Sequence, residues 1–335
     1  MKLGVIGAGL VTSGSHLPVL VNMPGVSVDW ICDRSAGVAE SVARAYKIPQ
    51  SFSDLSHCPD VDVVLVATPV GARKTVIPQA LARGWHVFSE KPFAITLEEH
   101  DSYIAEARKH GRQLGVGQVR RYAKPTATAR ELLHRDFLGP VLRVSAAEGF
   151  HMRATGRGAG WHMTDPGAGG GVLMETGSHL VDQLLYVLGA RSVSLNEAAQ
   201  RRHLGIELAA TLDADITMEN GDTVPCSIEL SLIEDLCNGV FIEYPNYILK
   251  VGLFFEDTLA LITSEGDTLS TLGVTEGVDN PTAGFVAEWS DFLEQCRSGK
   301  PSAVDAVSVR NTTALIESAY KYTQTAERVV AAGAR

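Results

Sequence analysis

A glycine-rich turn follows a short apolar strand near the start of the chain and leads directly into a helix. The strand is Lys2–Ile6, and residues 7–12 read GAGLVT. The first glycine permits a tight turn, and the second lets the backbone approach a pyrophosphate, to which the helix N-terminus offers its N–H groups. This order of strand, turn and helix predicts a dinucleotide-binding unit. The residues expected at the cofactor are Gly7, Gly9, Leu10 and Val11.

Two positions near this turn bear on the cofactor. Asp33 follows the second predicted strand, Val26–Cys32, where a carboxylate accepts hydrogen bonds from an adenosine ribose and repels a 2′-phosphate, which favours NAD. Arg34 beside it could accommodate that phosphate, so NADP stays open. Thr12 stands where Gly or Ala is usual, and we expect its larger side chain to hold the helix slightly farther from the strand.

Strand and helix signals alternate over the first part of the chain. Val61–Ala67 reads VDVVLVA, a run typical of a strand buried on both faces. Helices are expected over Val76–Arg83, ending at Gly84, and over Leu97–His110, ending at Gly111. Such alternation predicts a doubly wound parallel sheet with helices on both faces.

The pattern changes after about residue 120. From 208 to 271 the signals are mostly strands separated by turns, and two helices close the chain. We therefore predict an α/β protein with two domains. Residues 1–120 form a dinucleotide-binding Rossmann domain, and residues 121–335 form an α+β domain with an antiparallel sheet.

Composition and charge exclude several classes of protein. Hydrophobic residues make up 45% of the chain and charged residues 20%, which excludes disorder. A net charge of −10 disfavours nucleic acid, and no apolar run approaches the roughly 18–20 residues that span a membrane. The five dispersed cysteines form no C-x-x-C pair, which argues against disulfides or zinc and indicates a reducing cytoplasm. His151 and His162 lack ligand spacing, so we expect no metal.

A lysine follows a short predicted strand in the segment Ser89-Glu90-Lys91-Pro92. A lysine at the edge of the expected crevice can exchange a proton with a substrate near neutral pH, and Pro92 fixes the backbone beside it. A solvated loop lysine is the alternative interpretation.

A second chemistry-bearing stretch, residues 169–182, reads GGGVLMETGSHLVD. If the segment from Glu175 is helical, Glu175 and His179 share one face, and Asp182 could orient the imidazole. A carboxylate and an imidazole at this spacing can hold a substrate hydroxyl and relay its proton. The alternative is an arrangement that only caps and packs the helix.

Together these segments resemble the Gfo/Idh/MocA family, that of glucose–fructose oxidoreductase and inositol dehydrogenase, over essentially the whole chain. The segments that carry the resemblance are the N-terminal G-x-G with His16-Leu17-Pro18, Ala67-Thr68-Pro69, the block GWHVFSEKP at 84–92, Trp161, and Gly177-x-His179-x-x-Asp182.

The resemblance implies hydride transfer between a nicotinamide and a carbon bearing a hydroxyl or ketone, usually on a sugar or cyclitol. It also implies a substrate-binding second domain whose open, mostly antiparallel sheet mediates homodimers or homotetramers. Three other functions stay open. They are a keto-sugar reductase in a biosynthetic pathway, a non-redox NAD-dependent enzyme of glycosidase type, and an NAD(P)-binding regulatory protein.

The family's catalytic residues carry over to three positions. Lys91 matches the catalytic lysine and His179 the active-site histidine, and both are expected at the substrate. Glu175 stands where many members have Asp, four residues before that histidine. We favour Lys91 as the direct acid or base and His179 as the orienter or relay.

The family's cofactor residues carry over in part. Thr68 and Pro69 match the turn that lies along the cofactor, and Glu90 and Lys91 are expected beside it. After that turn many members have Asn and His. This chain instead has Val70 and Arg73, so no contact is carried over to these two side chains.

Basic residues near the domain junction suggest an anionic group on the substrate. Arg120 and Arg153 could grip a phosphate or carboxylate in a bidentate manner, and Trp161 could stack on a sugar face. The alternative is that these arginines are solvated or pair with acidic side chains.

Overall fold

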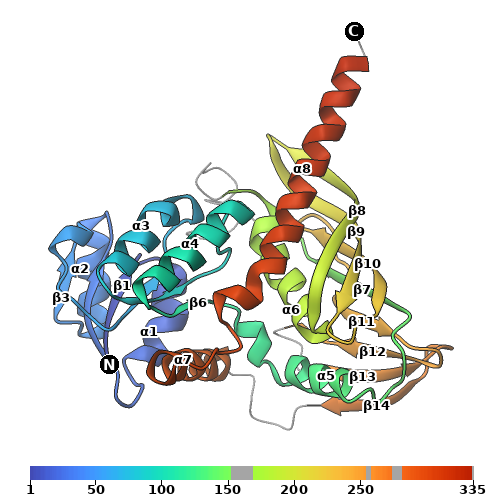
Figure 1. Cartoon of the computed structure of the whole chain (residues 1–335), viewed down its shortest axis with the longest axis horizontal. Coiled ribbons are helices and arrows are strands. Elements are labelled where there is room, and N and C mark those ends of the chain that lie inside the picture. The colour runs from blue at the N-terminus through green and yellow to red at the C-terminus, as the bar shows by residue number, and fades with distance from the viewer. Residues whose placement is uncertain (152–168, 254–257, 274–280, 334–335) are drawn as a thin grey trace. The chain divides into compact units, whose positions relative to one another are not determined.

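The computed structural model describes residues 1–151, 169–253, 258–273 and 281–333 (Figure 1). The chain divides into two compact units. The first comprises residues 1–119 and 280–310, and the second comprises residues 120–279 and 311–335. Among the described residues, no helix is long and apolar enough to cross a membrane.

The first unit contains a six-stranded sheet in which every pair of neighbouring strands is parallel. Its order, β3-β2-β1-β4-β5-β6, changes direction between β1 and β4, and ligands of doubly wound sheets bind where the order reverses. The predicted parallel sheet is confirmed. Its strands are β1 Lys2–Ile6, β2 Ser27–Cys32, β3 Gln50–Phe52, β4 Val63–Val66, β5 His86–Ser89 and β6 Leu114–Val116.

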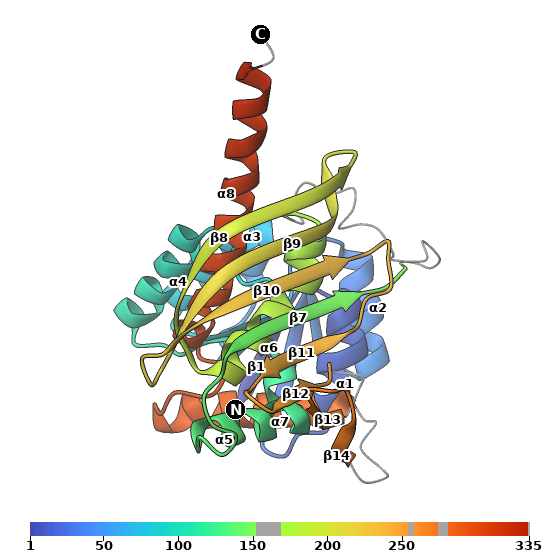
Figure 2. The ribbon, with the colours of Figure 1, turned by 90° about the vertical axis from the view of Figure 1, so that its right-hand side faces the viewer.

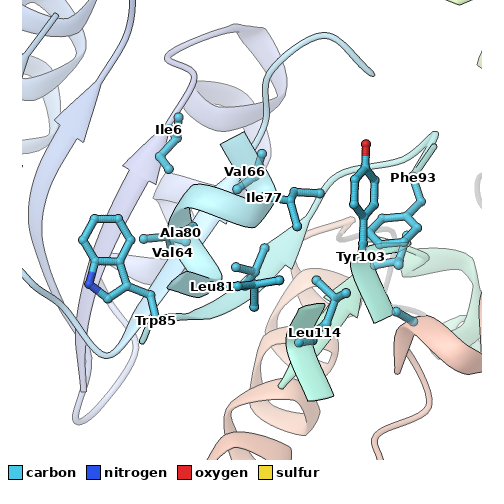
Figure 3. Close-up of a cluster of buried hydrophobic side chains, with 14 of the residues drawn as sticks. Ile6, Val64, Val66, Ile77, Ala80, Leu81, Trp85, Phe93, Tyr103 and Leu114 are labelled. Atoms are coloured by element: carbon cyan, nitrogen blue, oxygen red, sulfur yellow. The ribbon is translucent and has the colours of Figure 1, made fainter. Parts of the chain in front are cut away.

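Helices cover both faces of this sheet. Helices α3 and α4 lie side by side, as do α1 and α7 (Figure 1). The side chains that fill the core between β4, α3 and α4 alternate along the strand and recur at helical spacing (Figure 3). Each of these elements therefore contributes one of its faces to this core. They include Val64, Val66, Ile77, Leu81 and Tyr103. The helices are α1 Leu17–Leu20, α2 Ala36–Tyr46, α3 Val70–Ala82, α4 Leu97–His110 and α7 Pro281–Ser298.

Helix α7 belongs to the first unit although it comes late in the chain. The sequence prediction assigned everything after residue 120 to the second domain, and the structure differs for residues 280–310. The reason is aromatic packing. The ring centroids of Trp289 and Phe292 lie 4.4 and 5.1 Å from that of Phe88 on β5. Side chains alternate along a strand and the adjacent Val87 belongs to the core beside α3 and α4, so Phe88 faces the other side of the sheet.

The second unit contains an eight-stranded sheet in the order β14-β13-β12-β11-β7-β10-β9-β8. Its strand pairs are antiparallel except for β7 and β10, so the predicted mostly antiparallel sheet is confirmed. The strands are β7 Arg143–Gly149, β8 Ala190–His203, β9 Ile206–Met218, β10 Thr223–Ser231, β11 Gly239–Glu243, β12 Tyr247–Val251, β13 Thr258–Thr263 and β14 Thr268–Gly273.

One face of this sheet is covered by helices and the other is open. Exposed and buried side chains alternate along β10, as expected when only one face packs on a core. Figure 2 views the open face, with α5 and α6 behind it. The helices of this unit are α5 Lys124–His134, α6 Ser178–Leu188 and α8 Arg310–Gly333.

Candidate cofactor and active site

The glycine turn after β1 has the shape that a dinucleotide requires. Gly7 has a φ of +101°, and a Cβ there would lie 2.6 Å from the carbonyl oxygen of Ala67, so only glycine fits. At Gly9 a Cβ would meet no described atom within 4 Å, which leaves the backbone open to a pyrophosphate. These features fit NAD, which the turn and the N–H groups behind it would hold.

Thr12 strengthens this turn. Its side chain is fully buried, and its hydroxyl donates to the carbonyl oxygen of Gly7 at 2.7 Å. The chain continues as a π-helical turn, Thr12–His16, before α1 begins. The expected cost of a larger residue is therefore offset by a hydrogen bond that closes the loop.

Asp33 lies at the end of β2, against the same turn. Its two carboxylate oxygens accept hydrogen bonds from the backbone N–H groups of Ala8 and Ser35, both at 2.9 Å. A 2′-phosphate beside this carboxylate would meet a negative charge. Arg34 is exposed next to it, and the side chains of Leu10 and Val11 are exposed on the turn itself.

A buried chain of hydrogen bonds holds the turn that carries Lys91. The indole N–H of Trp289 donates to Nδ1 of His16 at 2.9 Å, and Nε2 of His16 lies 2.7 Å from a carboxylate oxygen of Glu90. Because an indole nitrogen can only donate, Nδ1 of His16 must accept. Nε2 of His16 therefore carries the proton and donates a hydrogen bond to Glu90. The other Glu90 oxygen accepts the backbone N–H of Lys91 at 2.9 Å.

The ionisation of Glu90 follows from these partners. Burial by itself would raise the pKa of Glu90. The hydrogen bond from His16 and the charges of Lys91 and Arg73 outweigh burial, so the pKa of Glu90 lies below its ordinary value. Glu90 therefore remains a carboxylate at neutral pH and keeps accepting the Lys91 N–H. The Lys91 side chain is half-buried.

Glu175 and His179 lie on one continuous helical segment of the second unit. The segment begins with a π-helical turn, Leu173–Gly177, and continues as α6. Every residue between 171 and 180 is buried except Glu175 and His179, which are half-buried. The two side chains therefore share the one accessible stripe of this segment, as the spacing predicts.

Asp182 has partners other than the one its spacing suggests. Its carboxylate accepts two hydrogen bonds from the Arg121 guanidinium, at 2.7 and 2.6 Å, and one from the Thr312 hydroxyl at 3.1 Å. Burial opposes the charge on Arg121, but Asp182 outweighs it and raises the pKa of that arginine. These hydrogen bonds join Arg121, near the start of the second unit, and Thr312 of α8 to α6. Orientation of His179 by Asp182 stays a prediction.

The predicted substrate arginines and tryptophan divide into two groups. Arg120 is buried, and its two Nη atoms donate to both oxygens of Glu148 at 2.7 and 2.8 Å. A substrate anion at Arg120 would have to compete with this carboxylate. Arg153 and Trp161 lie outside the described residues.

Three residues of the sites were missed by reasoning from the sequence. Glu207 is buried on β9, and one of its oxygens accepts the N–H of Gly171 at 2.6 Å and the hydroxyl of Tyr320 on α8. These two residues anchor the glycine stretch that leads into Glu175. Arg73, the third, is buried at the start of α3. No periodicity or motif marks Glu207 and Tyr320, because their partners lie far along the chain. For Arg73 the one signal is that it departs from the residue many family members have after the Thr68–Pro69 turn.

Within the described part of the chain, no group of three or more His, Cys, Asp or Glu side chains could hold a metal ion. The five cysteines are all free thiols.

Comparisons with protein-family models match both parts of the chain. Residues 1–118 match the model of an oxidoreductase family with an NAD-binding Rossmann fold, named GFO_IDH_MocA. Residues 126–235 match a GFO/IDH/MocA C-terminal domain.

Several proteins of similar sequence are named as oxidoreductases or dehydrogenases. An uncharacterized oxidoreductase of Schizosaccharomyces pombe is 30% identical over 208 residues, which span 60% of this chain and 56% of that protein. Trans-1,2-dihydrobenzene-1,2-diol dehydrogenase of Mus musculus is 26% identical over 79% of this chain and 78% of that protein. Inositol 2-dehydrogenase of Salmonella typhimurium is 32% identical over 43% of this chain and 44% of that protein.

Solved structures share the fold at lower identity. Aldose–aldose oxidoreductase from Caulobacter crescentus has a TM-score of 0.81 at 20% identity, over 97% of this chain and 98% of that one. KijD10, a 3-ketoreductase from Actinomadura kijaniata solved with NADP, has a TM-score of 0.77 at 17% identity, over 96% and 97% of the two chains.

Proposed function

Since the chain belongs to the GFO/IDH/MocA family of oxidoreductases, with an NAD-binding Rossmann domain, we propose that it is an NAD-dependent dehydrogenase or reductase. Its substrate is a sugar, sugar derivative or cyclitol, and hydride passes between the nicotinamide and a carbon that bears a hydroxyl or ketone. The relative named inositol 2-dehydrogenase supports this class of substrate, because inositol is a cyclitol, and the relative named for a cyclic diol supports oxidation at a CH–OH carbon.

One observation carries the proposal. Gly7 follows β1, Thr68 follows β4 and Lys91 follows β5, and these three strands are neighbours in a parallel sheet. The carboxyl ends of parallel strands meet at one edge, so the glycine turn, the Thr68–Pro69 turn and the lysine lie along the same edge. This shared edge supports the proposal that Lys91 exchanges a proton beside the cofactor turn.

The chemistry divides between cofactor and protein. Bound NAD supplies the hydride acceptor or donor, held by the glycine turn, Asp33 and the Thr68–Pro69 turn. Oxidation of a CH–OH carbon removes one hydride and one proton. Lys91 accepts the hydroxyl proton, and in reduction it returns the proton to the oxygen. The proposal gives His179 and Glu175 the role of holding the hydroxyl and relaying its proton.

Asp33 favours NAD over NADP in this proposal. Its carboxylate is fixed by two backbone N–H groups and cannot turn away without breaking those hydrogen bonds. Arg34 would have to outweigh that charge for NADP to bind as well.

We propose that the protein acts as a homodimer or homotetramer in the cytoplasm. The open face of the second sheet supports self-association, and the free thiols support a reducing compartment. Arg153 and Trp161 remain proposed substrate contacts.

The first test is a fluorescence titration with NADH and NADPH, followed by a screen of sugars, cyclitols and sugar nucleotides at the nicotinamide absorbance band. We expect tighter binding of NADH and turnover of one substrate class. The Lys91→Ala variant should bind NADH but lose about 10²–10⁴-fold in turnover. Tight cofactor binding without turnover in either direction would instead favour the non-redox or regulatory functions.

A further inference from the structure

Arg73 is a buried arginine whose donors all meet backbone carbonyls in the turns around it. It lies in the first turn of α3 and is 3% exposed. Nε and Nη2 donate to the carbonyl oxygen of Thr68 at 3.1 and 2.9 Å, and Nη2 also donates to that of Lys91 at 3.3 Å. Nη1 donates to the carbonyl oxygens of Glu90 and Pro92.

These contacts join two separate turns. Thr68 belongs to the turn after β4, which is expected along the cofactor, and residues 90–92 form the turn after β5, which carries the lysine. A planar guanidinium can donate in several directions at fixed angles, whereas an ammonium acts as a point donor at the end of a flexible chain. The contact pattern therefore requires an arginine.

The guanidinium keeps its charge in this environment. Burial lowers the pKa of Arg73 to about 10, against the attraction of the Glu90 carboxylate, so the side chain is protonated at neutral pH. All its donors are therefore available to the carbonyl oxygens.

The peptide groups on both sides of Lys91 are held by buried charges. Glu90 accepts the N–H of Lys91, and Arg73 donates to its C=O. The direction in which the lysine side chain leaves the backbone is consequently set by two side chains, one acidic and one basic. Neither of them needs to touch a substrate to do this.

We propose that Arg73 is a positioning residue that fixes the Lys91 turn against the Thr68 turn and thereby sets where the lysine amine meets substrate and cofactor. This inference rests on the proposed function, in which Lys91 moves the substrate proton. It gives a role to a position at which this chain departs from its family's usual residue.

The test is a double-mutant cycle on the full chain. Arg73→Met should lower kcat by about 10²-fold, because a displacement of about 1 Å at a reacting group costs that much, while the Kd for NADH changes far less. In a Lys91→Ala background the same substitution should cause little further loss, because Arg73 acts through the lysine. Arg73→Lys, which restores the charge without the planar fork, should recover only part of kcat.

Arg83→Met is the matched control. Arg83 follows the same helix and also donates to backbone carbonyls, those of Leu55 and Cys58, but away from the lysine turn. Its loss should leave kcat near the wild-type value. Equal kcat values for Arg73→Met and Arg83→Met, or a full additive loss in the Lys91→Ala background, would overturn the inference.

A second readout needs no turnover. Hydrogen exchange followed by mass spectrometry should show faster exchange of the segment 86–96 in Arg73→Met than in the wild type, with no such change in Arg83→Met. Unchanged exchange of that segment would show that Arg73 does not hold the turn. If the wild type binds NADH but turns over no substrate, the proposed function fails. The exchange comparison would still decide whether Arg73 holds the Lys91 turn against the Thr68 turn.

Discussion

At the scale of single residues, the hydrogen-bond partners of two buried histidines in the first unit show which ring nitrogen carries a proton. His16 is the clearest case, because Trp289 donates to one ring nitrogen and Glu90 accepts from the other. A second buried histidine, His100, has Nε2 2.9 Å from the carbonyl oxygen of Ala306 and packs edge-on against Phe93. Since a carbonyl only accepts, that nitrogen carries a proton in the neutral ring.

His100 predicts a loss of stability in acid. Burial lowers the pKa of His100 to about 4, below its value of about 6.5 in an unfolded chain. A lowered pKa in the folded state means that the unfolded state binds the proton first as the pH falls. The His100 contribution is therefore complete above about pH 6.5 and is lost progressively down to about pH 4, by about 3 kcal/mol.

The measurement is the free energy of unfolding in urea at several pH values for the wild type and for His100→Gln. The glutamine amide can still donate to Ala306 but does not titrate. We expect the difference between the two proteins to change between pH 6.5 and 4 and to stay constant above that window. A constant difference across the whole range would contradict the assignment.

At the scale of elements, the close approach of one segment to another decides where the helical segment with Glu175 and His179 begins. Gly171 precedes the π-helical turn that carries Glu175, and its N–H is held by the buried Glu207. A Cβ at Gly171 would overlap the carbonyl oxygen of Glu207 on β9. The helix with Glu175 and His179 can start where it does only because this position has no side chain.

Gly171→Ala should therefore destabilise the protein and also impair activity. Overpacking against backbone that cannot move aside costs about 1–3 kcal/mol, and the displaced helix should lower kcat more than it changes the Kd for NADH. Urea unfolding and steady-state kinetics would measure the two effects. Gly37→Ala is the control, since a Cβ there meets no described atom within 4 Å. Matching stability and kcat in the two variants would refute this role for Gly171.

Helix boundaries show how local signals perform at this scale. The predicted helix Leu97–His110 is confirmed. Thr96 accepts the N–H of Glu99 at its start, and Gly111 adopts the left-handed conformation at its end. The helix predicted over Val76–Arg83 instead begins at Val70, directly after Pro69. Arg73 in its first turn donates to the carbonyl oxygens of Thr68 and Lys91, and no helical or strand pattern indicates these contacts.

At the scale of the whole molecule, the first unit is completed by a segment from the other end of the chain. Trp289 of α7 is fully buried, stacks near Phe88 and donates its indole N–H to His16. The parallel sheet and its cofactor turn therefore depend on residues that follow the second sheet in the sequence.

Trp289→Ala should destabilise the first unit by about 3–5 kcal/mol, because it removes a large buried ring and leaves His16 without its donor. Val286→Ala on the same helix should change stability by less than about 0.5 kcal/mol, since Val286 is exposed. Thermal unfolding with and without NADH would compare the two variants. Equal melting temperatures would show that α7 is not part of the first unit's core.

The sequence by itself determined the features that depend on neighbouring residues. The glycine turn after β1, the strand β4 buried on both faces, and the shared face of Glu175 and His179 follow from backbone conformation and from the patterns of strand and helix. Both sheet types followed from the order of such local signals.

Only the tertiary structure decided which distant side chains meet. Arg73 donates hydrogen bonds to the backbone of the Lys91 turn, Arg120 pairs with Glu148, and α7 belongs to the first unit. Each depends on contacts between segments far apart in the chain, where a buried polar group takes whichever partner the fold places within hydrogen-bond distance. Composition and periodicity describe a residue's own segment, and they hold no information about that partner.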